Sequence, residues 1–145
     1  MTQSRAEELS HIARAFRAAI ERSRAEKVSP HLPYFPDGAC RIVSRLFAVH
    51  LNRRGFEGIR YCEGHVPGFD DSVRHAWLVV EGSVVDLTAD PFGQGPVVVA
   101  SVSAFHESLD AIREVDAMAA AAAITPEAAE RDGRLLAQIE SRLGS

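Results

Sequence analysis

The sequence predicts a single α+β domain in which helices pack against a small antiparallel sheet. Two helical patterns come first, three or four strand candidates follow, and helical patterns end the chain. Segregated helices and strands joined by short hairpins are typical of this class. The clearest strand signal lies between Arg74 and Asp90, where two apolar runs flank the pair Glu81-Gly82. A two-residue break that contains glycine between such runs indicates a β-hairpin.

Length, composition and charge narrow the classes of protein to consider. A chain of 145 residues that is 46% hydrophobic and 25% charged can bury one substantial core. Its net charge of -4 argues against non-specific binding of nucleic acid. Neither an apolar leader nor a run long enough to span a bilayer is apparent, so we expect a cytoplasmic protein without a membrane partner. In that reducing compartment, Cys40 and Cys62 are expected to be thiols.

Helical periodicity accounts for the first part of the chain. Apolar residues recur every three or four positions from Ala6 to about Lys27, which predicts the first helix. The proline-rich segment from Ser29 to Gly38 predicts an irregular connection. A second amphipathic helix is expected to begin at Ala39 or Cys40 and to end before Gly55.

The second part of the chain is predicted to contain the sheet and then further helices. Phe56–Val66 is a strand candidate before the hairpin, and Val97–Val102 is expected to be a short buried strand after it. Phe105–Ala123 is predicted to be a helix. Thr125 and Pro126 have the residue types of a helix cap and a first helical position, so a last helix should run to about Leu143. Residues from about 104 to 145 either belong to the single domain 1–145 or form a helical appendage to it.

The hairpin places two polar side chains on one face. With Glu81-Gly82 as the loop, Val80 lies opposite Ser83, and the side chains of each strand alternate between faces. One face then carries His75, Trp77, Val79, Val84, Asp86 and Thr88. The other face, expected to be core, carries Ala76, Leu78, Val80, Val85 and Leu87. His75 and Asp86 are diagonal neighbours in this register, and a slip of one residue would separate them.

Cys40 at the start of a helix adds a possible nucleophile. Helix N-termini have free N–H groups and a partial positive charge, which favour a thiolate and can stabilise an oxyanion on a substrate carbonyl. Cys40, His75 and Asp86 therefore supply a nucleophile, a general base and a residue that orients the base.

Three motifs carry a resemblance to a known family: Gly38-Ala39-Cys40, His75-Ala76-Trp77 and Val85-Asp86-Leu87-Thr88. Over roughly Phe35 to Val99 the chain resembles the transglutaminase-like branch of the papain-like cysteine enzymes. The resemblance implies a Cys-His-Asp triad that needs no cofactor. It also implies acyl transfer from an amide or ester of a protein, peptide or small molecule to water or an amine. Arg41 departs from the family pattern, which has glycine, tryptophan or tyrosine just beyond the cysteine, and no second oxyanion donor can be assigned.

Two other functions stay open. The same fold could serve as a binding or scaffold module with a vestigial triad. Alternatively, Cys62 and His65, together with Cys40 and His75, offer four ligands of the kind that bind zinc. Against zinc, a separation of three residues on a strand directs Cys62 and His65 to opposite faces, so Cys62 is expected to be a core residue.

The remaining candidates have structural interpretations. Trp77 is expected to lie in the core or in the wall of the cleft, packed against His75. Asp90 would replace Asp86 as the orienting carboxylate if the register differed, although a turn is expected there. His50 lies on the apolar stripe of its helix and is expected to be buried. Solvent exposure is the expectation for His31, His106 and the N-terminal arginines.

Overall fold

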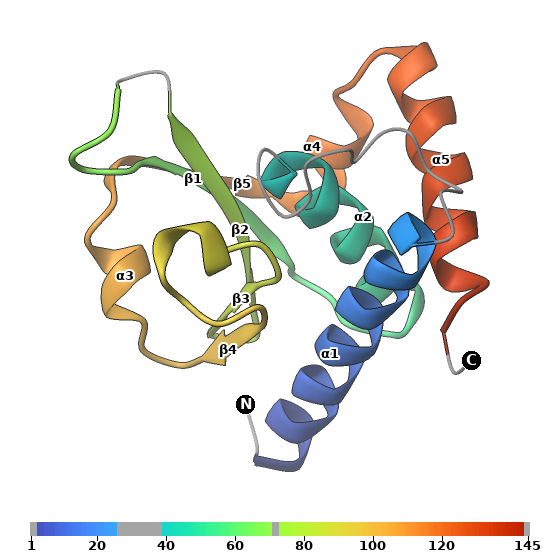
Figure 1. The fold of residues 1–145 in the computed structure, drawn as a ribbon, viewed down its shortest axis with the longest axis horizontal. Coiled ribbons are helices and arrows are strands. Elements are labelled where there is room, and N and C mark those ends of the chain that lie inside the picture. The colour runs from blue at the N-terminus through green and yellow to red at the C-terminus, as the bar shows by residue number, and fades with distance from the viewer. Residues whose placement is uncertain (1–2, 26–38, 71–72, 144–145) are drawn as a thin grey trace.

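A five-stranded antiparallel sheet with strand order β4-β3-β2-β1-β5 forms the centre of the fold (Figure 1). The computed structural model describes residues 3–25, 39–70 and 73–143. In chain order, its elements are α1 (Gln3–Ala25), α2 (Cys40–Arg53), β1 (Arg60–His65), β2 (Arg74–Val80), β3 (Ser83–Asp86), the 3-10 helix η1 (Asp90–Phe92), β4 (Val98–Ala100), α3 (Ala104–Glu107), β5 (Asp110–Asp116), α4 (Ala117–Ala122) and α5 (Pro126–Glu140). The predicted α+β class with an antiparallel sheet is confirmed.

The two N-terminal helices form where the apolar periodicity predicts them. Leu9, Phe16 and Ile20 of α1 are fully buried, and α2 begins at Cys40 and ends before Gly55. Gly55 has a φ of +93°, which suits a helix stop because glycine adopts this conformation without steric cost. The predicted connection Ser29–Gly38 lies outside the described residues. No helix in the described part of the chain is long and apolar enough to cross a membrane.

The hairpin has the predicted register. Val80 pairs with Ser83 and Leu78 with Val85, and both loop residues have positive φ, at +51° for Glu81 and +84° for Gly82. Two positive φ values give the loop the twist of the flanking strands. The aliphatic face predicted for the core is buried against α1 and α2. Its members, Ala76, Leu78, Val80, Val85 and Leu87, are each at most 4% exposed.

The opposite face of the sheet is also covered. Cys62, Val66, Trp77 and Leu109 form a second buried cluster, against which Phe92 and Phe105 pack. These two phenylalanines come from η1 and α3, and α3 lies on the side of the sheet away from α1 and α2 (Figure 1). His75 and Asp86 are on this face, so burial on both sides of the sheet removes them from water.

The predicted helix Phe105–Ala123 is wrong. This stretch forms the short helix α3, the edge strand β5 and then α4. Strand β5 is antiparallel to β1, with Tyr61 opposite Val115 and Glu63 opposite Arg113. All its residues are exposed, so no apolar alternation marks the strand in the sequence. Its pairing with β1 overrides the helix propensity of its alanine, arginine and glutamate residues.

The other late elements match the prediction more closely. Thr125 caps α5, since its Oγ1 accepts a hydrogen bond from the Ala128 N–H at 3.1 Å, and Pro126 opens the helix. Leu135 and Ile139 of α5 belong to the same core cluster as α1 and α2. The strand expected at Val97–Val102 is shorter, because β4 comprises three residues, and these are half-buried rather than buried.

Candidate active site

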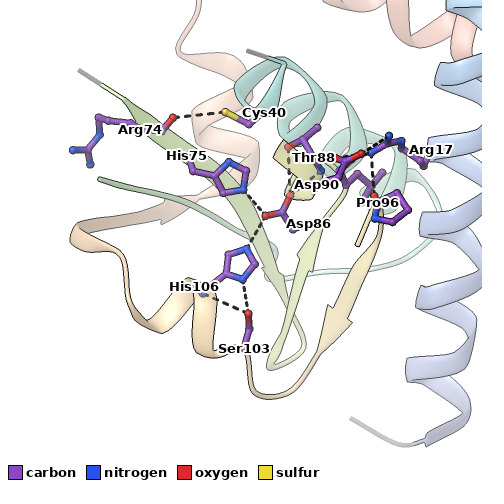
Figure 2. A network of polar contacts seen from close by, with 11 residues as sticks. Arg17, Cys40, Arg74, His75, Asp86, Thr88, Asp90, Pro96, Ser103 and His106 are labelled. Carbon is purple, nitrogen blue, oxygen red and sulfur yellow. Dashed lines mark hydrogen bonds and ion pairs between the residues drawn. The ribbon is translucent and has the colours of Figure 1, made fainter. Parts of the chain in front are cut away.

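Cys40 is the first residue of α2 and is partly exposed. Its sulfur lies 3.9 Å from the carbonyl oxygen of Arg74, the first residue of β2 (Figure 2). The N-cap residue of α2 is Ala39, which has no polar side-chain atom to bond the first turn. The helix N-terminus, with its free N–H groups and partial positive charge, therefore meets the beginning of β2 at a thiol that solvent can reach.

His75, the residue after Arg74 in β2, is buried. The side chain is 1% exposed, and its Nε2 lies 2.5 Å from Oδ2 of Asp86. Burial opposes protonation of the ring, but hydrogen bonds with Asp86 and Cys40 and the negative charges of both groups outweigh burial and raise the pKa of His75 to about 9. Of the three predicted site residues, the structure joins His75 and Asp86 by a hydrogen bond, whereas Cys40 contacts the carbonyl oxygen of Arg74, the residue before His75.

Asp86 is held as a buried carboxylate by hydrogen bonds on both oxygens. Oδ1 accepts from the Thr88 N–H at 2.9 Å, while Oδ2 is shared by His75 and His106. Burial alone would raise the pKa of Asp86. The hydrogen bonds from His106 and His75, the charge of His75 and the Thr88 N–H together lower it to about 2. An ionised group with this many partners fixes the direction in which His75 points.

His106 is a member of the site that the sequence prediction missed. It was expected to be exposed, but it is 3% exposed, and its Nε2 lies 2.6 Å from Oδ2 of Asp86 (Figure 2). Its Nδ1 is 2.6 Å from Oγ of Ser103. If the Ser103 hydroxyl donates to Nδ1, the neutral ring of His106 carries its proton on Nε2, toward Asp86. The local signal was Ser103, an N-cap residue type just before Ala104, but nothing near it in sequence points to Asp86.

Aromatic rings enclose His75. Trp77 stacks on it, with ring centroids 6.0 Å apart and an interplanar angle of 19°, as predicted. Phe92 and Phe105 approach it edge-on at 5.1 and 5.9 Å. An apolar enclosure keeps water from the His75–Asp86 pair and so strengthens its electrostatic interaction.

The structure does not bring the predicted zinc ligands together. Cys62 is 2% exposed, as expected for a core residue, and its sulfur lies 3.7 Å from Oε1 of Glu114. Burial, together with the Glu114 charge and hydrogen bond, raises the pKa of Cys62 to about 12. His65 instead contacts the carbonyl oxygens of Phe69 and Asp70 through its Nε2. Among the described residues, the clustered ligand atoms belong to His75, Asp86 and His106.

Asp90 binds Arg17 rather than orienting His75. Its Oδ2 is 2.9 Å from Nη2 of Arg17, and Nη1 of the same arginine donates to the Leu87 carbonyl at 2.7 Å. Arg17 is 6% exposed, so the expectation that the N-terminal arginines are exposed is wrong for this residue. Its contacts attach α1 to the segment that follows β3.

Two further histidines were predicted from the sequence, His50 as buried and His31 as exposed. His50 is buried as predicted, with Nδ1 at 2.7 Å from Oε2 of Glu140. His31 lies outside the described residues.

Comparison of the chain with protein-family models, curated proteins and solved structures finds no match.

Proposed function

We propose that this chain is a cysteine-dependent hydrolase or acyltransferase with a transglutaminase-like fold, acting on an amide or ester through a thioester. The observation that carries the proposal is the position of His75. Its ring bonds the buried Asp86 carboxylate at 2.5 Å, and the Cys40 sulfur lies 3.9 Å from the carbonyl oxygen of Arg74, the residue before His75. A nucleophile, a base and an orienting group gathered in this way are what covalent acyl transfer requires.

The ring nitrogens of His75 have separate tasks in this proposal. Nε2 faces Asp86, so this nitrogen carries a proton and donates it in a hydrogen bond to the carboxylate. The other nitrogen, Nδ1, is then the one that accepts the thiol proton of Cys40. Because the pKa of His75 is raised to about 9, the ring can hold that proton at neutral pH and balance the charge of a thiolate.

The reaction follows in two halves. The Cys40 thiolate attacks the carbonyl carbon, and the resulting oxyanion is stabilised by N–H groups in the first turn of α2. When the carbon–nitrogen or carbon–oxygen bond breaks, protonated His75 gives its proton to the leaving group and the acyl group remains on sulfur. His75 then takes a proton from water or an amine, which attacks the thioester and releases Cys40.

A metal site is the second candidate, favoured by the clustering of His75, Asp86 and His106, whose ligand atoms lie within 4.8 Å of one another. The distances support hydrogen bonding rather than metal coordination. Two ligands about 2.0–2.1 Å from zinc at a tetrahedral angle are about 3.3 Å apart. The nitrogen–oxygen distances here are 2.5 and 2.6 Å, which are hydrogen-bond distances.

Thiol reactivity and acylation test the proposal. Treatment with iodoacetamide below about pH 8 should modify Cys40 well before Cys62, whose pKa is raised to about 12. Incubation with p-nitrophenyl acetate should leave an acetyl group on the Cys40 peptide, detected by mass spectrometry and removed by hydroxylamine. Cys40→Ala should lose the adduct, and His75→Gln should slow its formation.

The opposite results have a clear meaning. If Cys40 alkylates no faster than Cys62 and forms no thioester, the proposed chemistry is wrong. A binding or scaffold module is then the better description. Zinc found in stoichiometric amount in the purified chain, and lost in His106→Ala, would favour the metal site instead.

A further inference from the structure

A pocket of about 460 Å³ lies along the outer edge of the sheet, beside the candidate active site. Tyr61 and Glu63 of β1 and Arg113 and Val115 of β5 contribute the sheet side of this pocket. The N-terminal half of α2 and the α4 segment contribute the other side. None of these residues takes part in the acyl-transfer steps, so they are available to bind a part of the substrate other than its reacting carbonyl.

The pocket adjoins the nucleophile. Arg41, which follows Cys40 in α2, lines it and lies 3.3 Å from Glu63. Glu63 is also 3.8 Å from the guanidinium of Arg74, whose carbonyl oxygen contacts the Cys40 sulfur. A substrate whose reacting carbonyl sits at Cys40 can therefore extend into this pocket.

The charges in the pocket do not balance. Glu63 accepts a hydrogen bond from Tyr61 and pairs with Arg41, so its charge is matched. Arg45 is matched by Asp132 at 3.0 Å. Arg113 lies opposite Glu63 across the β1–β5 pair, yet it makes no ion pair with any residue in the described part of the chain. A cation without a partner in a protein of net charge -4 favours an anionic ligand.

The rest of the lining is apolar. Val115, Ala119, Ala120, Ala123 and Ile124 form this wall. Alanines leave room against α4 for a bulkier group, and an arginine guanidinium at the rim can bind a carboxylate in a bidentate manner. This combination of an apolar wall and an unmatched cation is suited to a ligand that carries a carboxylate on an apolar body.

We infer that this pocket is the substrate subsite and that the enzyme prefers amides or esters with a carboxylate on an apolar group next to the scissile bond, such as acidic peptides. The inference rests on the proposed function, because it takes Cys40 as the reacting group. Arg113 is the specificity-determining cation.

Matched alkylating probes test this preference without a known substrate. The probes are 4-(iodoacetamido)benzoate and its neutral analogue 4-(iodoacetamido)benzamide, and the readout is the ratio of their rates at Cys40. The anionic probe should react several-fold faster than the neutral one, measured relative to the same ratio for free cysteine. Arg113→Gln should lower the ratio toward that of free cysteine, because the anionic probe loses more rate than the neutral probe.

Arg60→Gln is the matched control. Arg60 lies on β1, as Tyr61 and Glu63 of the pocket do, but its side chain belongs to the opposite face, where it pairs with Glu114 at 3.4 Å. This variant removes the same charge outside the pocket and should leave the ratio as in the parent protein. Equal ratios in the parent protein and in Arg113→Gln, with Cys40 still more reactive than Cys62, would overturn the subsite and leave the proposed function standing. Lack of reaction at Cys40 with every probe would instead contradict the proposed function.

Discussion

His106 of α3 reaches Asp86 on the face of the sheet that α3 covers, with its Nε2 at 2.6 Å from Oδ2 of the carboxylate. The same oxygen accepts from His75 at 2.5 Å, so one buried atom connects α3 to the hairpin. Two imidazoles on one carboxylate oxygen make the orientation of each ring depend on the other. His106 is therefore a positioning residue that acts through Asp86.

Replacement of His106 should loosen this arrangement. His106→Leu removes one of the hydrogen bonds that stabilise the Asp86 carboxylate, and loss of a buried partner costs about 1–3 kcal/mol. The pKa of Asp86 should rise, because the His106 hydrogen bond is a main cause of its lowering. We expect a lower free energy of unfolding in urea and a slower acylation of Cys40.

The conservative variant separates positioning from simple packing. His106→Gln keeps an amide N–H that can donate to Asp86, so it should recover part of the acylation rate that His106→Leu loses. Carboxyl resonances in an NMR titration would report the pKa of Asp86 directly. Equal acylation rates and an unchanged Asp86 pKa in both variants would show that His106 has no positioning role.

The stability of the protein should fall as pH rises through the titration of His75. The folded pKa is raised from 6.5 to about 9, so protonated His75 contributes stability that is fully present below pH 6.5 and is lost as pH rises through about 9. Asp86 has the opposite sign. Its pKa is lowered from 3.8 to about 2, so its contribution is present above pH 3.8 and is lost as pH falls toward 2.

Urea unfolding over this range measures the effect. The parent protein should lose stability between pH 6.5 and 9. In His75→Gln the curve over the same range should be flatter, since the titrating ring is gone. A parallel decline in both proteins would assign the loss to other groups.

Local patterns predicted the parts of the site whose geometry depends on neighbours in sequence. The start of α2 at Cys40 followed from apolar periodicity, and the register that puts His75 and Asp86 on one face followed from the Glu81-Gly82 loop. In each case the feature is determined by residues only a few positions away.

The features that sequence reasoning missed depend on contacts between distant segments. Strand β5 has no buried residue and exists through hydrogen bonds to β1, which lies about fifty residues earlier in the chain. His106 appeared to be a helix surface residue because that strand was not foreseen. Once β5 interrupts the long helix, α3 folds over the hairpin and its histidine meets Asp86. Arg17 was missed for the same reason, since its partners belong to the segment after β3.

Arg17 should be important for stability even though it lies outside the site. Its guanidinium holds Asp90 with two contacts, at 2.9 and 3.2 Å, and donates to the Leu87 and Pro96 carbonyls. Arg17→Leu leaves these acceptors without their cation, and breaking a buried ion pair costs about 3–5 kcal/mol, reduced here because Asp90 is partly exposed. Urea unfolding should show a large loss of unfolding free energy, and hydrogen exchange should accelerate in the segment from Leu87 to Pro96.

The exposed Arg14 offers a control, since Arg14→Leu should change stability little. Comparable losses in the two variants would contradict the assigned role of Arg17.

Gly64 sets how closely β5 can approach β1. A Cβ at this position would lie 3.0 Å from Cβ of Leu109, 3.3 Å from Cγ1 of Ile112 and 3.4 Å from the ring of Trp77. The Leu109 Cβ is attached to the backbone and cannot swing away, so the strands would have to separate. We expect Gly64→Ala to cost about 1–3 kcal/mol, as overpacking of a core does.

Gly133 in α5 is the matched control, because a Cβ there meets nothing within 4 Å. Gly133→Ala should stabilise the protein by about 0.5–1 kcal/mol, the usual penalty of glycine within a helix. Urea unfolding of both variants distinguishes crowding from a general effect of the substitution, and a stabilising Gly64→Ala would show that β5 can move away from β1 without cost.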